Sequence, residues 1–314
     1  MDVFYWPGGP TPAFAQSVAA LGVFDGVHVG HQCILKAVVR EARVRSASAV
    51  VVTLDRHPHN VLGGSPQRCI TSMAHRLRLF AEMGLDACIV LVFSDSVAAM
   101  PAEEFARRVL RDNLGARLLV AGPDCRFGRC ARGNVQMLQQ MEGELGLETQ
   151  VVEPVRVDGE LVSSTAIRQA IEVADLEKAE RFLGRPFSLL GTVVSGAGRG
   201  TRLGFPTANL DVHNELLPRH GVYATLLLGG AKCYPSATSV GTQQTFRQEE
   251  GARTVVEVHV IGDCPDLRGA EVEVRFVKCL REQRRYGSAE ALKEQMKLDV
   301  AAAMSALRGG HLPS

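Results

Sequence analysis

Two histidines in a glycine-rich turn are the first residues of this chain whose types and spacing suggest chemistry. The stretch "GVFDGVHVGHQ" (residues 22–32) places His28 and His31 three positions apart, with Gly30 between them. Three roles are open for such a pair: metal ligands, a turn cap with a packed partner, or hydrogen-bond donors to phosphate. A metal role requires a third and a fourth ligand, and the sequence offers no HExxH motif or comparable set.

The surroundings of the pair favour a bound anion. We expect "ALGVF" (20–24) to be a short strand, "DGVHVG" (25–30) a turn and "HQCILKAVVREA" (31–42) a helix. Strand ends and helix starts form the usual ligand crevice of an α/β sheet. The free N–H groups and the dipole at the start of a helix attract negative charge. Gly26 and Gly30 let the backbone come close to a ligand.

Three further polar stretches follow expected strands or begin a helix, namely "TLDRHPHNVL" (53–62), "AGPDCRFGRCARGN" (121–134) and "VSSTAIRQAI" (162–171). In the last of these, the hydroxyls of Ser164 and Thr165 and the guanidinium of Arg168 can hold a polyphosphate between them. The alternative is that the hydroxyls cap the helix and that Arg168 is a solvated surface residue.

The second half of the chain contains oxygen ligands and an isolated carboxylate. In "GFPTANL" (204–210), Thr207 and Asn209 lie on one face if the segment is extended, and both can offer oxygen to Mg²⁺. Glu257 interrupts the apolar strand "TVVEVHVI". A carboxylate facing a barrel interior is costly unless it is used, which favours a general base. Strand alternation leaves open that Glu257 points to solvent.

The elements that would position these residues change in character near residue 185. Before it, strand patterns alternate with amphipathic helices, and this alternation predicts right-handed βαβ crossovers and a doubly wound parallel sheet, Rossmann-like in class. The expected strands are 48–54, 87–93, 116–122 and 147–152, and the expected helices are 31–45, 71–83, 101–115 and 133–145. In the helix at 101–115, Pro101 suits the first helical position and Gly115 the end.

After residue 185 the pattern indicates an antiparallel β-barrel or sandwich that ends in one helix at about 288–307. The stretch "DLEKAERFLGRPF" (175–187) predicts a last helix stopped by Gly184, with Pro186 after it. We therefore expect two domains, 1–185 and 186–314.

Composition restricts the class of protein. A chain of 314 residues exceeds one ordinary hydrophobic core, and its 46% hydrophobic and 22% charged residues describe a soluble protein. A net charge of +1 does not suggest nucleic acid or anionic membrane as a partner, and no protein partner is implied. The first basic residue is Lys36, which argues against a signal peptide, and the longest apolar run, 87–93, is too short for a membrane span. Eight cysteines without a CxxC pair suit reduced thiols in a cytoplasm.

Four motifs together resemble those of one enzyme family. They are "FDGVHVGH" (24–31), "SSTAIR" (163–168), "GFPTANL" (204–210) and "LREQRRYGSAEALKEQMKLD" (280–299). Their order resembles the HxGH nucleotidyltransferase superfamily and, within it, the prokaryotic bifunctional riboflavin kinase/FAD synthetases, over about residues 17–303. The resemblance implies that the first domain transfers AMP from ATP to FMN and releases pyrophosphate. It also implies that the second domain transfers the γ-phosphoryl group of ATP to riboflavin, with Mg²⁺ accompanying the ATP.

The resemblance assigns roles to particular residues. In the first domain, His28 and His31 would contact the ATP phosphates in the transition state, and Ser164, Thr165 and Arg168 would hold the departing pyrophosphate. Further nucleotide contacts are expected at Gly22, Phe24, Asp25 and Gly30 in this domain, and at Gly196, Gly198 and Gly200 in the second domain. Asp25 is expected to stabilise its turn more than to perform chemistry, and the glycines of 191–204 suit a β-hairpin as well as a phosphate loop. Flavin contacts are expected at Asn60, Asp124 and Arg281. In the kinase domain, Thr207 and Asn209 would hold Mg²⁺ and Glu257 would be the general base.

Some positions depart from the family pattern. "TLDRHP" carries Leu54 and Arg56 where the family has phenylalanine and proline, and "GPDCRFG" carries Cys125 where it has an aromatic residue. On the kinase side, Gln244 stands for a proline and Arg268 for a tyrosine. Two alternatives therefore stay open here: an FMN adenylyltransferase with a weak or inactive kinase domain, and a non-catalytic flavin-binding or regulatory protein.

Overall fold

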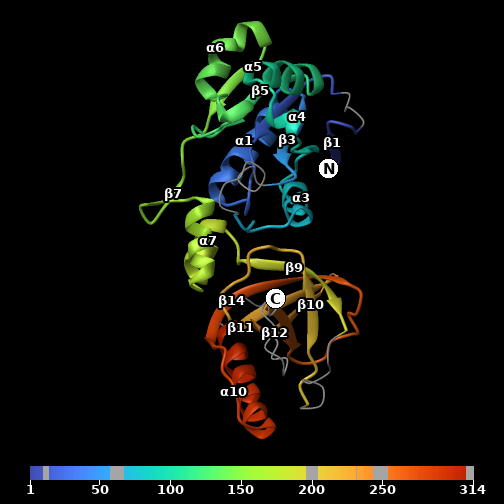
Figure 1. Cartoon of the computed structure of the whole chain (residues 1–314), viewed down its shortest axis with the longest axis vertical. Helices are drawn as coiled ribbons and strands as arrows, with labels where there is room; N and C mark the ends of the chain where they lie inside the picture. The colour runs from blue at the N-terminus through green and yellow to red at the C-terminus, as the bar shows by residue number, and fades with distance from the viewer. Residues whose placement is uncertain (10–13, 57–66, 196–203, 231, 243–253, 309–314) are drawn as a thin grey trace. The chain divides into compact units, whose positions relative to one another are not determined.

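A computed structural model describes residues 1–9, 14–56, 67–195, 204–230, 232–242 and 254–308 (Figure 1). The chain forms two compact units, Met1–Ser163 and Ser164–Ser314, and each is described by itself. None of the helices in these ranges is long and apolar enough to cross a membrane.

The first unit is built on a six-stranded parallel sheet in the order β1-β4-β3-β2-β5-β6. Its strands are β1 (Asp2–Trp6), β2 (Ser17–Leu21), β3 (Ser48–Leu54), β4 (Ala87–Leu91), β5 (Ala116–Ala121) and β6 (Glu148–Val151). The inner strands are almost fully buried on both faces, as continuous β-branched and apolar runs require when helices cover both sides. The expected doubly wound sheet is thus confirmed, with an additional edge strand, β1, that the sequence analysis did not anticipate.

Helices cover both faces of this sheet. They are α1 (Val29–Val44), α3 (Met73–Glu82), α4 (Asp95–Ala98), α5 (Ala102–Phe105), the π-helix η1 (Ala106–Asn113), the short 3₁₀-helix η2 (Arg129–Ala131) and α6 (Val135–Leu145). Alternate residues of each strand belong to different hydrophobic clusters. Val18 and Ala20 of β2 pack with α1 and α3, whereas Ala19 and Leu21 pack with α5, η1 and α6.

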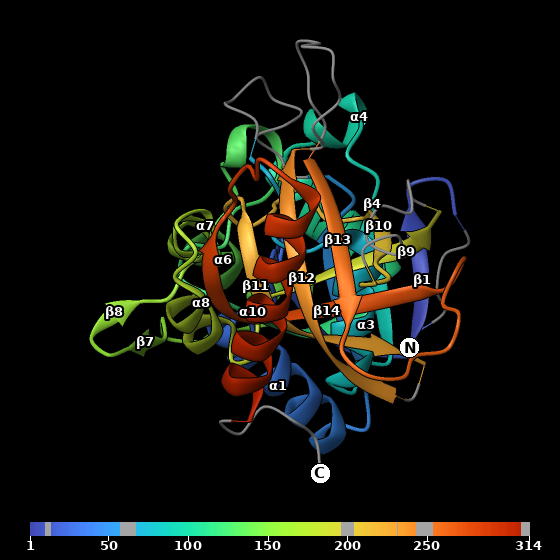
Figure 2. The same ribbon diagram turned by 90° about the horizontal axis from the view of Figure 1, so that it is seen from below.

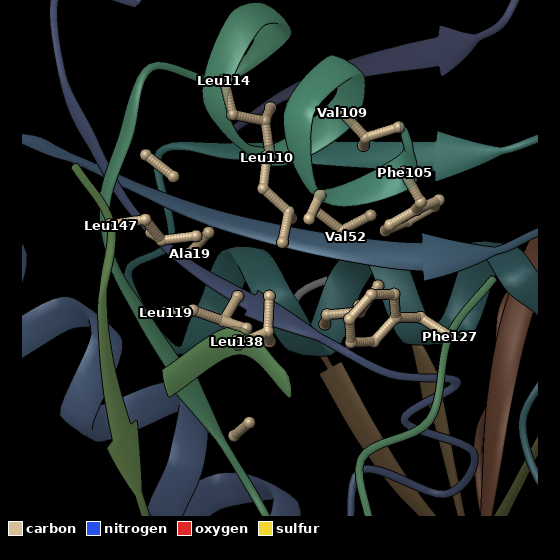
Figure 3. Close-up of a cluster of buried hydrophobic side chains, with 14 of the residues drawn as sticks. Ala19, Val52, Phe105, Val109, Leu110, Leu114, Leu119, Phe127, Leu138 and Leu147 are labelled. Carbon is tan, nitrogen blue, oxygen red and sulfur yellow. The ribbon is translucent and has the colours of Figure 1, made fainter. Parts of the chain in front are cut away.

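Figure 3 shows the second of these clusters. Phe105, Val109 and Leu110 of α5 and η1 cover Ala19 and Val52 of the sheet, and the same cluster includes Leu138 of α6. Tight packing on both faces leaves the strands little freedom to shift, so the loops at their ends start from a rigid base.

Two local predictions differ from the structure. The strand expected at 20–24 ends at Leu21, because Phe24 adopts a positive φ of 53° that no strand accommodates. The helix expected at 101–115 has Pro101 as its N-cap residue rather than its first helical residue, and it changes to π-helix from Ala106.

The second unit contains a closed antiparallel barrel in the order β10-β13-β12-β11-β14-β9 (Figure 2). Its strands are β9 (Ser188–Val194), β10 (Ala208–Val212), β11 (Gly221–Gly229), β12 (Lys232–Thr242), β13 (Thr254–Val260) and β14 (Glu271–Glu282). The terminal helix α10 (Ala289–Leu307) packs Ala303 and Leu307 against Ala224 and Leu226 of β11 on the outside of the barrel. The predicted barrel with a terminal helix is confirmed.

Two helices and one hairpin lie between the sheet and the barrel in sequence. They are α7 (Ser164–Glu172), α8 (Leu176–Leu183) and the hairpin β7 (Arg156–Val157) and β8 (Glu160–Leu161). Gly184 stops α8 with a φ of 69°, as predicted. Both helices group with the barrel, so the compact units divide about twenty residues before the boundary at 185 that the sequence suggests.

Candidate functional site

The turn after β2 lies at the point of the sheet where ligands usually bind. β2 pairs with β3 on one side and with β5 on the other. From β2 the chain continues to β3 and β4 on one side of the sheet, and it then crosses to β5 and β6 on the other side. In open α/β sheets, the carboxyl ends of the strands at such a switch point form a crevice. Residues 22–28 leave β2 at this point, and residues 122–134 leave β5 beside it.

His28 is the N-cap of α1. Its Nδ1 accepts a hydrogen bond from the backbone N–H of His31 at 3.3 Å, and the side chain is buried. An accepting Nδ1 carries no proton, so the proton of the neutral ring is on Nε2. The His28 ring therefore has a donor at Nε2, close to the positive end of the helix dipole.

His31 lies against the same ring. The two imidazoles are stacked, with centroids 3.5 Å apart, and the Phe24 ring meets His31 edge-on at 5.2 Å. Burial lowers the pKa of His31 well below 6.5, and the nearby His28 and Arg76 lower it further. The Nδ1 atom of His31 is buried without a hydrogen-bond partner among the described residues. His31 is thus a neutral imidazole with unused hydrogen-bonding capacity.

Gly30 makes the stacking possible. A Cβ atom at this position would lie 3.2 Å from Cε1 and Nδ1 of His28. Glycine thus leaves room for the His28 ring beside the first turn of α1.

Asp25 holds the turn in place. Its buried carboxylate accepts hydrogen bonds from the backbone N–H groups of Ile70 and Thr71, and the N–H of Gly26 donates to the Thr71 hydroxyl at 3.0 Å. These bonds support the expectation that Asp25 stabilises the turn. Val27 adopts a φ of 42°, a strained conformation for a β-branched residue, and Asp25 and Thr71 help to maintain it.

The loop after β5 carries Asp124. The Sγ of Cys125 lies 3.8 Å from the carbonyl oxygen of Leu21, which brings this loop to the end of β2. Asp124 is exposed, and Gly122 leaves room for its carboxylate, since a Cβ there would lie 2.9 Å from Asp124 Oδ1. Burial raises the pKa of the Cys125 thiol to about 12, so this sulfur is an unreactive packing group.

Other expected residues of the adenylyl-transfer site belong elsewhere. Ser164, Thr165 and Arg168 are on α7, which is part of the second compact unit. Asn60 lies outside the described residues, as do Gly196, Gly198 and Gly200, the nucleotide contacts expected in the second domain.

In the barrel, the strand register brings together residues that are far apart in sequence. Asn209 of β10 lies directly opposite Glu257 of β13. Directly opposed residues of an antiparallel pair have Cβ atoms about 4.5–5.5 Å apart and point to the same face. Thr207, two residues before Asn209, precedes β10. Asn209 and Glu257, an expected ligand and the expected base, therefore share one face of the strand pair.

That face is not the barrel interior. Val256 and Val258, which flank Glu257, are buried and pair with Val240 and Thr238 of β12. Glu257 pairs with Ser239 and is half-buried on the opposite face. The expectation of an inward carboxylate is wrong, because the interior of this small barrel is filled by the alternate residues. On this outer face, Glu257 lies beside Asn209 of the neighbouring strand.

Arg281 is held within the protein. It forms a two-pronged ion pair with Asp299 of α10, at 2.8 and 2.6 Å, and its guanidinium lies 5.7 Å from the Tyr286 ring centroid. The pair with Asp299 raises the pKa of Arg281, so it is a fixed positive charge that ties α10 to β14. A flavin contact by Arg281 stays a prediction.

Two residues that support the turn after β2 were not predicted from the sequence. Thr71 bonds the turn, and Arg76 of α3 is a buried cation beneath it. An arginine in an amphipathic helix gives no local signal that it faces inward, and Thr71 is 45 residues from the turn it supports. In the described part of the chain, no group of three or more His, Cys, Asp or Glu residues could hold a metal ion.

Comparison with known proteins covers both units. A family model of FAD synthetase matches residues 11–166, and one of riboflavin kinase matches residues 183–307. Proteins described as bifunctional riboflavin kinase/FMN adenylyltransferase are similar along the chain. The protein of Escherichia coli K12 is 34% identical over 90% of both chains, and that of Pseudomonas fluorescens is 33% identical over 93% of both. The chain belongs to the bifunctional riboflavin kinase/FMN adenylyltransferase family.

A solved structure agrees with this two-part architecture. A protein of Streptococcus pneumoniae, described as a macrolide-efflux protein, is 30% identical and superimposes with a TM-score of 0.81 over 94% of this chain and 95% of that one. The likeness supports the parallel-sheet and barrel fold. The family's FAD synthetase and riboflavin kinase domains are thus both present in this chain.

Proposed function

We propose that this chain converts riboflavin to FMN in its barrel and FMN to FAD in its parallel-sheet domain, using ATP in both reactions. The observation that carries the proposal is that one chain matches both the FAD synthetase and the riboflavin kinase family models. The pair of neutral histidines at a helix start supports the first reaction, and the pairing of Asn209 with Glu257 supports the second.

In adenylyl transfer, the protein mainly aligns two phosphates and neutralises developing charge. His28 suits this role, because its Nδ1 accepts from the backbone at the start of α1, where a phosphate would bind. The N–H groups at the start of α1 would add further donors. Arg168, Ser164 and Thr165 would hold pyrophosphate as it leaves, and Asp124 and Asn60 would contact the flavin.

In phosphoryl transfer, Mg²⁺ would accompany ATP. The donor set fits this ion, since Thr207 and Asn209 offer hard oxygen ligands and Mg²⁺ commonly keeps waters and phosphate oxygens in the rest of its shell. The ion would neutralise charge on the phosphates. Glu257, across the strand pair from Asn209, would accept the proton of the riboflavin hydroxyl.

The departures from the family pattern affect affinity more than identity. Arg268 forms an ion pair with Asp266 at the surface, so it can be accommodated without disturbing the barrel. Gln244 lies outside the described residues. The proposed roles of Thr207, Asn209 and Glu257 depend on neither residue.

A reducing compartment suits this chain. All eight cysteines lie within the described residues, and all are free thiols. We propose the cytoplasm as its location and small molecules as its partners.

The conversion itself tests the proposal. Purified protein is incubated with riboflavin, ATP and Mg²⁺, and FMN and FAD are separated. We expect both products in sequence. FAD formed from supplied FMN alone would favour a protein with an inactive kinase domain, and bound but unchanged flavin would favour a non-catalytic flavin-binding protein.

A further inference from the structure

Arg76 is a buried positive charge whose hydrogen bonds, within the described part of the chain, all go to uncharged groups. It lies on α3, 2% exposed, and its Nη1 donates to the carbonyl oxygen of Val23 at 2.6 Å and to the Thr53 hydroxyl at 3.3 Å. Its Nε has no hydrogen-bond partner among the described residues. No ion pair joins it to a carboxylate in the described part of the chain.

Such an arrangement is costly by itself. A guanidinium stays protonated in proteins, so it cannot avoid burial by losing its charge. A buried charge that is paired with uncharged oxygens alone keeps most of its desolvation penalty. An arginine in this place therefore suggests that an anion completes the site.

The contacts of Arg76 lead to the turn that carries the histidines. Val23 lies between the end of β2 and Phe24, and Thr53 is near the end of the neighbouring strand β3, where its hydroxyl donates to the same Val23 carbonyl at 3.0 Å. Arg76 thereby joins α3 to the start of residues 22–28. Its charge also acts on His31. Burial lowers the pKa of that imidazole most, and the charges of His28 and Arg76 lower it further.

We propose that Arg76 is a positioning residue for adenylyl transfer, which holds the turn after β2 and supplies a buried positive charge that the polyphosphate of the bound nucleotide compensates. The inference rests on the proposed function of the first unit. It makes Arg76 a contributor to nucleotide affinity that acts through the turn and through its field, without touching the reacting atoms.

Steady-state kinetics of FAD formation from FMN test this role in the full chain. We expect Arg76→Met to raise the KM for ATP at least about tenfold, with a smaller change in kcat. Arg76→Lys keeps the charge and is expected to retain most of the affinity for ATP. Arg40→Met is the matched control, because Arg40 is an exposed arginine of α1, the helix that carries His31, and is paired with Glu41. We expect it to behave as wild type.

Unfolding separates this role from a merely structural one. Trp6, the single tryptophan, lies on β1, so its fluorescence follows the first unit. We expect the Arg76→Met midpoint without nucleotide to be equal to or above that of wild type, since an uncompensated buried charge is removed. The rise of the midpoint on adding ATP should be smaller than in wild type. A lowered midpoint with an unchanged KM for ATP would overturn the proposal and leave Arg76 a structural residue.

Two further results would also be informative. If Arg76→Met does not unfold cooperatively, Arg76→Lys is compared with Arg76→Gln, and equal KM values for ATP in those two variants would contradict a role for the charge. If the wild type makes no FAD from FMN, the proposed function fails before the variants are compared. A wild type that makes FAD, with an Arg76→Met variant of unchanged kinetics, removes this inference alone.

Discussion

The hydrogen bond that His28 Nδ1 accepts from the backbone of α1 is the feature of this residue that matters most for chemistry. The backbone bond to Nδ1 selects the tautomer, and the stacked His31 keeps the ring in place. His31 in turn stays neutral because it is buried beside two other basic groups. A phosphate role therefore rests on hydrogen bonding and the helix start more than on imidazolium charge.

The first prediction concerns His31→Ala. Removing this ring takes away one proposed phosphate contact and the ring against which His28 stacks. We expect FAD formation from FMN to fall at least about a hundredfold, the scale for losing a preorganised transition-state donor. FMN formation from riboflavin should be nearly unchanged, because the barrel has its own core. A folded variant with near-normal FAD synthesis would exclude the phosphate role.

The second prediction concerns Glu257→Gln. The substitution keeps the shape of the side chain and removes its basic oxygen. If Glu257 is the general base, riboflavin phosphorylation should fall by roughly two to four orders of magnitude while flavin binding is retained. FAD formation from added FMN is the internal control and should persist. Kinase activity close to wild type would instead favour a Glu257 that interacts mainly with solvent.

Only some features of these sites could be predicted from the sequence. The histidine pair and its helix start could be predicted from local spacing, because the turn and the helix are contiguous in sequence. The face on which Glu257 lies could not, since alternation defines two faces without saying which of them is inside the barrel. The support from Thr71 and Arg76 was missed because it depends on contacts between distant segments.

At the scale of elements, the first turn of α1 is shaped by the absence of a side chain at Gly30. The gap that Gly30 leaves is occupied by the His28 ring. Helix propensity and site geometry therefore make opposite demands at this position.

The third prediction uses that conflict. Gly30→Ala should leave the stability of the first unit unchanged or raise it by up to about 1 kcal/mol, since alanine favours the helix. FAD formation should fall by about tenfold, because the new Cβ displaces His28 from its alignment. Gly143→Ala in α6 is the matched control, as nothing beyond its chain neighbours and its own helix backbone lies within 4 Å of the added Cβ. Equal activity of the two variants would show that the close approach is unimportant.

Elements were predicted well where their own pattern is strong. The buried strands and α1, α3, α6 and α10 lie within a few residues of the expected ranges, because their hydrophobic periodicity is long and regular. The π-helix at Ala106 and the edge strand β1 were not expected. A π-helix has no distinct residue pattern, and β1 is short and half-exposed.

At the scale of the whole molecule, α7 and α8 decide where the domains divide. The riboflavin kinase match begins at residue 183, yet α8 packs against β14 with Leu176, Phe182 and Leu183 buried. The division at Ser163/Ser164 predicts that these helices help to stabilise the barrel, whereas a boundary at 185 predicts that they do not.

The fourth prediction compares two fragments, 164–314 and 186–314. Each large apolar side chain that loses its burial costs about 1.5–3 kcal/mol. We therefore expect the shorter fragment to unfold at a clearly lower urea concentration, with weaker riboflavin phosphorylation at the same temperature. Equal midpoints would support the boundary at residue 185.

The central claim is that one chain carries two independent active sites, and mixing two variants tests it most directly. His31→Ala and Glu257→Gln proteins are incubated with riboflavin, ATP and Mg²⁺, first separately and then together. Alone, His31→Ala should stop at FMN and Glu257→Gln should leave riboflavin unconverted. Together they should form FAD, because FMN released by one protein is a substrate for the other. A mixture that forms no FAD, although the wild type does and each variant keeps its other activity, would contradict two separable sites.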